Sequence, residues 1–193
     1  MSYRRCAPID RYFRPAARGR TLLSAEKSQL MKLYLVRHAS AEDPNPATDD
    51  KDRALTDGGK TKMIRAVEGL RKLKIHPLLI LTSPLKRAHE TAEILAGGLT
   101  GIRIEVMPEL APGCDSATIL EALRPHARHK SIALVGHQPG LGHLASFLLT
   151  GSDRRCDLDF KKGGVACLET EISDNPTSCV LEWFATPKLL RRI

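Results

Sequence analysis

Residues 32–38 read KLYLVRH, a short apolar run that ends abruptly in an arginine and a histidine. A compact apolar run of this kind is typical of a buried strand. Residues 40–55 then become rich in Pro, Asp and Asn, which predicts a polar loop. The sequence therefore predicts a buried strand that carries Arg37 and His38 at its carboxyl end.

Helical and extended patterns alternate along the chain after this strand. Thr56 is suited to cap a helix whose apolar residues recur at helical spacing. A second helix is expected to begin at Ser83-Pro84, with Ser at the cap and Pro at the first helical position, and to end at Gly97. Further strands are expected at 78–81, 102–106, 131–135, 165–172 and 179–185, and shorter helices at 117–123 and 141–149.

This alternation favours an α/β fold around a mainly parallel sheet. The last two strands, joined by a turn at 174–176, are expected to form a closing antiparallel pair at one edge or at the end of the chain. A length of 193 residues fits one ordinary domain with a sizeable core. We expect that domain to span residues 31–193.

The composition excludes several classes of protein. Hydrophobic residues make up 42% of the chain, and no apolar run approaches the roughly 18 residues that a membrane span needs. The five cysteines are odd in number and contain no C-x-x-C pair, so neither a disulfide framework nor a zinc site is indicated. A reducing, cytoplasmic location is the simplest interpretation, with no membrane partner.

The basic charge is concentrated at the N-terminus. Residues 1–30 hold seven basic and two acidic side chains, so this segment contributes +5 of the net charge of +8. The rest is mildly basic, which suits a phosphate-bearing substrate without requiring nucleic acid. The segment has no apolar core of a secretory signal. We expect a disordered extension and favour an upstream start before Met31 over a transit peptide.

Ionisable residues follow the predicted strands at the edge where ligands bind in open α/β sheets. Arg37-His38 follows the first strand, Arg87 lies on the helix after the second, Glu109 follows the third, and Gly136-His137 follows the fourth. One such coincidence would mean little. Four that converge on one rim indicate an active site.

The residue types at this rim suit phosphoryl transfer. Arginine forks match phosphate oxygens, and a neutral histidine such as His38 can attack phosphorus. Arg37 and Arg87 disfavour a further positive charge and should keep His38 partly neutral near pH 7. His137 can donate a proton as negative charge builds. Such a site needs no metal and no other cofactor.

Four motifs carry a resemblance to a known family: LYLVRHAS at 33–40, RALTDGG at 53–59, TSPLKRAHETA at 82–92 and VGHQP at 135–139. Their order is similar to that of the histidine phosphatase superfamily, the phosphoglycerate mutase-like group. The resemblance implies a single-domain three-layer sandwich, with His38 as the phosphorylated nucleophile and with Arg37, Arg87 and His137 forming the phosphate pocket.

The compact size and the RALT, MPEL and FKKGG segments resemble the SixA-type branch. In that branch the position of Arg53 also lies near the phosphate, and the substrates are phosphohistidines on signalling or carrier proteins. The chain departs from the family at Ala39, where glycine is commoner, and at His89, where glutamine is usual. We therefore expect a phosphohistidine phosphatase that acts through a covalent phosphohistidine intermediate.

Several alternatives stay open at this point. Glu109 can act as an acid or base, orient water or only organise the rim, and Arg53 can be a solvated loop residue. The substrate can instead be a small phosphoester, with a mutase less favoured. A non-catalytic phosphate-binding module would lack part of the pocket set, which is complete here. Nucleic-acid binding would depend on residues 1–30 and is not expected.

Overall fold

The structure, a computed structural model, describes residues 30–172 and 179–193. Its strands are β1 (Met31–Arg37), β2 (Ile80–Thr82), β3 (Ile104–Val106), β4 (Ser131–Gly136), β5 (Val165–Thr170) and β6 (Cys179–Ala185). Its α-helices are α1 (Asp57–Lys72), α2 (Lys86–Gly98), α3 (Ser116–Leu123), α4 (Gly140–Thr150) and α5 (Pro187–Leu190). Short 3-10 turns lie at Asp50–Asp52, Pro108–Leu110 and Arg124–His126.

Within the described residues the strands form one six-stranded sheet in the order β3-β2-β4-β1-β5-β6. Strands β1 to β4 are mutually parallel, whereas β5 runs antiparallel to β1 and β6 antiparallel to β5. The prediction of a mainly parallel sheet with a closing antiparallel pair is confirmed. Arg37 pairs with Gly136 in the register of β1 and β4, so the residues that follow these two strands emerge side by side.

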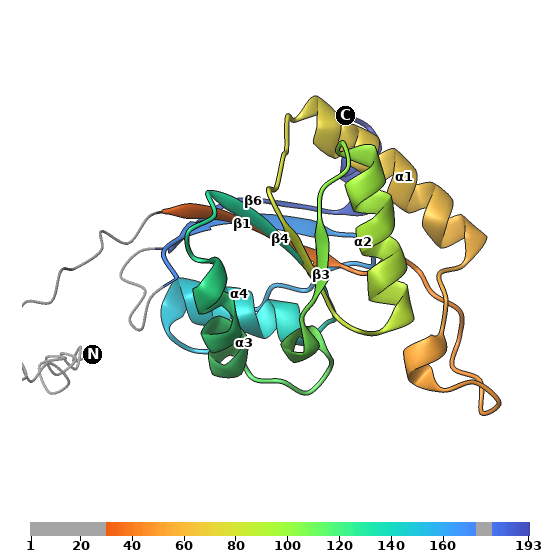
Figure 1. Ribbon diagram of the computed structural model, residues 1–193, viewed down its shortest axis with the longest axis horizontal. Helices are drawn as coiled ribbons and strands as arrows, with labels where there is room; N and C mark the ends of the chain where they lie inside the picture. Colours follow the sequence, from red (N-terminus) through yellow and green to blue (C-terminus); the bar gives the residue numbers. More distant parts are fainter. Residues whose placement is uncertain (1–29, 173–178) are drawn as a thin grey trace, which may run out of the picture.

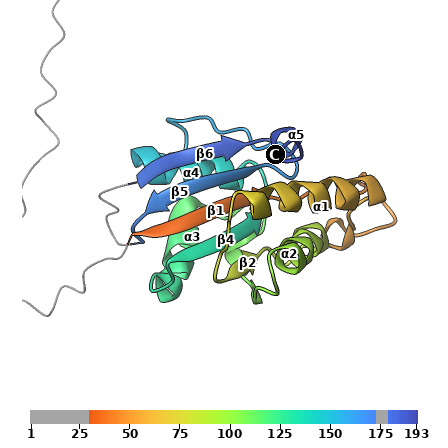
Figure 2. The same cartoon turned by 90° about the horizontal axis from the view of Figure 1, so that it is seen from above.

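Helices cover both faces of the sheet, which confirms the three-layer sandwich (Figures 1 and 2). Helices α1, α2 and α5 pack on one face, and α3 and α4 on the other. Alternation along β1 sends Leu33 and Leu35 into one core and Tyr34 and Val36 into the other. A strand that is buried on both faces reads as a continuous apolar run, which explains the pattern at 32–36.

The structure corrects the predicted start of the second helix. Helix α2 begins at Lys86 with Leu85 at its N-cap, and Ser83-Pro84 form a turn before it. The Ser83 side chain is fully buried, and its Oγ lies 2.9 Å from Nε2 of His137. The same Oγ accepts from the N–H of Leu85, the N-cap residue, at 3.3 Å, so Ser83 combines a tertiary contact with a local turn and is not itself the cap. The Thr56 cap is confirmed, because its Oγ1 accepts from the Gly59 N–H at 3.0 Å.

Two other expectations concern the ends of elements. Strand β3 is shorter than predicted, since it begins at Ile104 rather than at Ile102. The predicted turn at 174–176 lies outside the described residues, as do residues 1–29, so the disordered extension stays a prediction. In the part of the chain that is described, no helix is long and apolar enough to cross a membrane.

Candidate active site

His38 is the first residue beyond β1, and its backbone N–H donates to the Gly136 carbonyl at 3.0 Å. The ring lies with Nδ1 2.7 Å from the Ala39 carbonyl oxygen. Because a carbonyl only accepts hydrogen bonds, Nδ1 must carry the proton in this contact. The lone pair of the neutral ring is therefore on Nε2, which is the nitrogen available for attack on phosphorus.

Burial keeps the His38 ring neutral. Only 8% of the residue is exposed, and this burial lowers its pKa to about 4. The hydrogen bond to the Ala39 carbonyl opposes the shift, while Arg87 and Arg37 add to it. The sequence predicted a partly neutral His38 because of the arginines alone. The shift in its pKa is larger than that, because desolvation by burial is its main cause and the arginines add to it. Near pH 7 the ring is therefore almost entirely neutral, which is the form that the predicted role of nucleophile requires.

His137 follows β4 and faces His38 across the site. The two ring centroids lie 5.0 Å apart, and Nε2 of His137 contacts Ser83 Oγ at 2.9 Å. Burial lowers the pKa of His137 to about 3, with His38 and Arg87 contributing further. His137 is thus a neutral imidazole held beside His38, and a neutral imidazole can donate one hydrogen bond, as its predicted contact with a phosphoryl oxygen requires.

Arg37 and Arg87 are each held by a hydrogen bond from the guanidinium group to a backbone carbonyl. Nη1 of Arg37 donates to the Phe160 carbonyl, and Nη1 of Arg87 donates to the Asp50 carbonyl at 2.7 Å. The Nε atom of each arginine is buried and has no hydrogen-bond partner among the described residues. A buried N–H donor without a partner is costly. These two donors are suited to phosphate oxygens, which would satisfy both at once.

Asp50 links Arg53 to this pocket, a role that the sequence did not reveal. Its carboxylate lies 3.0 Å from Nη2 of Arg87 and accepts from Nε of Arg53 at 2.8 Å. The hydrogen bond from Arg53 holds the pKa of Asp50 below its ordinary value, with Arg87 acting in the same direction. Arg53 therefore joins the site through Asp50, whereas its predicted proximity to phosphate stays a prediction. The only sequence signal was the spacing of three between Asp50 and Arg53.

Gly163 brings the segment around Lys162 beside His38. Its N–H donates to the carbonyls of Arg37 at 3.1 Å and His38 at 3.0 Å, and its φ of 80° is one that favours glycine. Lys162 is close enough to lower the pKa of His38 further. The lysine thus adds positive potential at the rim, in addition to the arginines.

Glu109 lies in the 3-10 turn Pro108–Leu110, directly after β3, with a half-buried side chain. Among residues 30–172 and 179–193, no hydrogen bond or ion pair joins its carboxyl group to His38 or His137. The turn does bring the chain to the correct rim of the sheet. A catalytic role for Glu109 stays a prediction.

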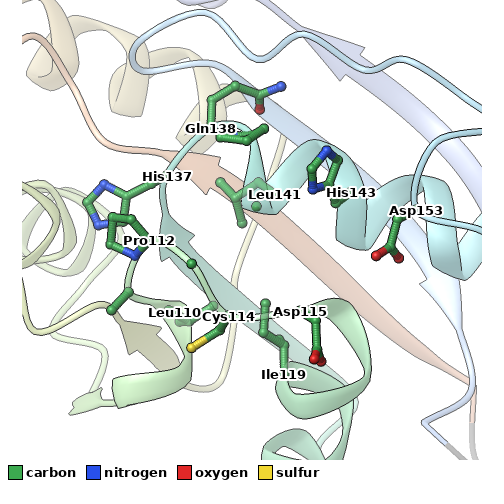
Figure 3. Close-up of a pocket in the computed structure, with 14 residues that line it drawn as sticks. Leu110, Pro112, Cys114, Asp115, Ile119, His137, Gln138, Leu141, His143 and Asp153 are labelled. Atoms are coloured by element: carbon green, nitrogen blue, oxygen red, sulfur yellow. The ribbon is translucent and has the colours of Figure 1, made fainter.

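A cleft of about 290 Å³ begins at His137 and runs between the starts of α3 and α4 (Figure 3). Its floor is apolar and includes Leu110, Ile119 and Leu141. Asp153 lines it beyond His143, at the other end from His137 (Figure 3). The described residues contain no group of three or more His, Cys, Asp or Glu side chains placed to hold a metal ion.

The two depressed histidine pKa values predict a pH-dependent stability. A histidine with a lower pKa in the folded state binds fewer protons there than in the unfolded chain, so stability falls as the pH drops. The window runs from about 6.5, the ordinary pKa, down to about 4 for His38 and about 3 for His137. Between pH 7 and pH 5 we expect a loss of about 2 kcal/mol per histidine in the free energy of unfolding.

Urea unfolding at both pH values measures this loss. The double variant His38→Gln, His137→Gln is the control, because every other titrating group is common to both proteins. The variant should lose clearly less stability on acidification than the natural protein. Identical pH dependence in the two proteins would contradict the assigned shifts.

Comparison with known proteins yields matches along most of the described chain. The family model of the histidine phosphatase superfamily (branch 1) matches residues 33–112. An uncharacterized protein of Picosynechococcus sp. is 38% identical over 142 residues, covering 72% of this chain and 86% of that protein. Phosphohistidine phosphatase SixA of Escherichia coli is 26% identical over 161 residues, covering 81% of this chain and 94% of that protein.

Solved structures agree with these matches. The protein histidine phosphatase SixA complexed with tungstate superimposes with a TM-score of 0.72 at 25% identity, covering 82% of this chain and 98% of that chain. A mycobacterial glucosyl-3-phosphoglycerate phosphatase gives a TM-score of 0.59 at 19% identity over 81% of this chain and 99% of that chain, which is a similarity of fold alone.

Proposed function

This chain belongs to the histidine phosphatase superfamily, within its SixA-type branch, and from that premise we propose that it removes phosphate from phosphohistidine on a signalling or carrier protein. The observation that carries the proposal is the state of His38. Its Nε2 holds a lone pair at neutral pH, beside Arg37 and Arg87, whose buried Nε donors have no partner within residues 30–172 and 179–193.

The proposed reaction has two steps. His38 Nε2 attacks phosphorus in line, a new N–P bond forms on His38, and the P–N bond of the substrate breaks as the substrate imidazole takes a proton. Water then attacks the phosphoryl group, the bond to His38 breaks, and inorganic phosphate leaves. Arg37, Arg87 and His137 hold the phosphoryl oxygens through both steps.

The surroundings of the histidines support a phosphoramidate substrate over an ester. An ester leaves as an alkoxide and benefits strongly from a positioned acid, whereas an imidazole departs easily once protonated by solvent. Among the described carboxyl groups, Asp50 reaches the site, but two arginines hold it ionised. Glu109 has no bond to either histidine. The described part of the chain therefore places no carboxylic acid in contact with the histidines of the kind that an ester needs.

A small phosphoester is the second candidate. The cleft beside His137 offers concave space for a small leaving group. In a reaction with such an ester, Glu109 would be the candidate for the general acid. The fold is also shared with glucosyl-3-phosphoglycerate phosphatase, a small-molecule enzyme by its name.

Substrate preference of the full-length protein tests the proposal. We expect kcat/KM for a phosphohistidine protein to exceed that for a panel of alkyl phosphoesters by at least about 10²-fold, the usual contribution of a general acid. The His38→Ala variant, assayed in parallel, gives the background. A preference for any ester would overturn the phosphohistidine assignment and raise Glu109 to the general acid.

The proposed partner is a phosphohistidine-bearing protein, with neither nucleic acid nor a membrane involved, and the proposed location is the cytoplasm. The described cysteines, Cys114, Cys156, Cys167 and Cys179, are free thiols, as suits a reducing compartment. Activity that required added nucleic acid, or enzyme that sedimented with membranes on cell fractionation, would contradict this part of the proposal.

A further inference from the structure

The cleft beside His137 has a charge opposite to that of the phosphate pocket. Asp115 and Asp153 line it, and neither lysine nor arginine does. The Asp115 carboxylate accepts from the Thr118 N–H at 2.7 Å, which holds its pKa below the ordinary value and keeps it ionised. The phosphate pocket, a short distance away across His137, is built from arginines. The site is therefore dipolar.

Two buried acceptor atoms belong to residues that line this cleft. Gln138 Oε1 and Asp153 Oδ1 are buried and have no hydrogen-bond partner among the described residues. The Gln138 amide is fixed, because its Nε2 donates to the Leu158 carbonyl at 3.2 Å and a Cβ at Gly142 would lie 2.8 Å from it. Acceptors that are fixed and unpaired call for a donor from a ligand.

The apolar floor narrows the chemistry of that ligand. Leu110, Ile119 and Leu141 lie between His137 and Asp153 along the cleft (Figure 3). A lysine or arginine side chain has an apolar stem that can lie on such a floor and a charged head that donates several hydrogen bonds. An anionic group in the cleft would instead meet two carboxylates and unpaired acceptor oxygens.

We propose that this cleft binds a basic side chain of the substrate protein, close to the phosphohistidine, and so selects among phosphohistidine sites. The inference rests on the proposed function, because it assumes a protein-borne phosphoryl group in the arginine pocket. The phosphoryl group binds between Arg37 and Arg87, while the lysine or arginine side chain of the substrate extends past His137 into the cleft. Its head then meets Gln138 Oε1 and the Asp153 carboxylate.

Matched phosphohistidine peptides test the selection with the full-length enzyme. Each peptide carries lysine, norleucine or glutamate at one position near the phosphohistidine. That position is varied over the first four residues on each side of the phosphohistidine. At the position that reaches the cleft we expect kcat/KM to fall at least about tenfold from lysine to norleucine, the loss of a charge-assisted hydrogen bond, and to fall further to glutamate. The rate with phosphoramidate serves as the reference for each enzyme variant, because this molecule has no side chain that could extend from the arginine pocket into the cleft.

The variant Asp153→Asn should bring the lysine-to-norleucine ratio close to one. Glu68→Gln removes a carboxylate from the exposed surface of α1, on the other face of the sheet, and should keep the ratio of the natural enzyme. Equal rates for all active peptides would overturn the inference and leave the phosphohistidine assignment intact. Turnover of esters without turnover of any phosphohistidine peptide would overturn both.

Discussion

Replacement of His38 by alanine is expected to lower kcat by at least about 10⁴-fold, as loss of a covalent nucleophile does in other enzymes. The structure holds one nitrogen ready for attack, because His38 donates through Nδ1 to Ala39 and leaves Nε2 free. His137 is a poor substitute, since Ser83 Oγ occupies its Nε2 at 2.9 Å. The natural enzyme should also form an acid-labile phosphoprotein, and the variant should form none.

Rapid quench with radiolabelled phosphohistidine protein measures both effects in one experiment. His76→Ala is the control, because His76 is exposed and its backbone carbonyl, which the substitution keeps, accepts from Ser131 Oγ. Circular dichroism checks that the variant is folded. Full activity in the His38→Ala variant would contradict the covalent mechanism. A natural enzyme that binds phosphate and never turns over would identify a non-catalytic binding module instead.

The second large effect is expected at Arg87. The Arg87→Ala variant should lose about 10²- to 10³-fold in kcat/KM, the usual effect of removing one preorganised donor to a developing anion. Lysine should rescue little of this loss, because its single nitrogen replaces three separate guanidinium nitrogens, of which two bond different atoms of Asp50 and the third is available to phosphate. Arg87 uses Nη1 and Nη2 for Asp50, while its Nε has no hydrogen-bond partner among the described residues.

Separate values of kcat and KM for Arg87→Ala and Arg87→Lys test this division of roles. Both variants should also bind inorganic phosphate more weakly, which titration calorimetry measures without turnover. Arg65→Ala, an exposed arginine on α1, gives the effect of a lost surface charge. A value for Arg87→Lys within about threefold of the natural enzyme would show that a point charge is enough, against the argument from geometry.

Local patterns predicted the elements that build the scaffold of the site. The KLYLVRH run at 32–38 predicted β1 because a strand covered on both faces must be apolar along its length. Thr56 predicted the start of α1 because its hydroxyl caps within three residues. The pocket residues followed, since parallel strands all end at one rim and the motifs place Arg37, His38 and His137 there.

Where sequence reasoning failed, a contact between distant residues had replaced a local preference. Ser83-Pro84 has the composition of a helix start, yet Ser83 bonds His137, which lies 54 positions along the chain. Asp50 had no visible role, because its partner Arg87 is 37 positions away. Neither contact produces a periodicity or a short spacing in the sequence, so neither could be predicted from local patterns.

The amino-acid sequence by itself determined the α/β class and the family, because strand burial, capping and short motifs are properties of neighbouring residues. The phosphate-binding and catalytic roles that it assigns to His38, His137, Arg37 and Arg87 stay predictions. Only the tertiary structure decided the protonation of His38 and His137, the anchoring of Arg87 by Asp50, and the acidic cleft beyond His137. These depend on how much water the fold removes and on which distant charges it brings together.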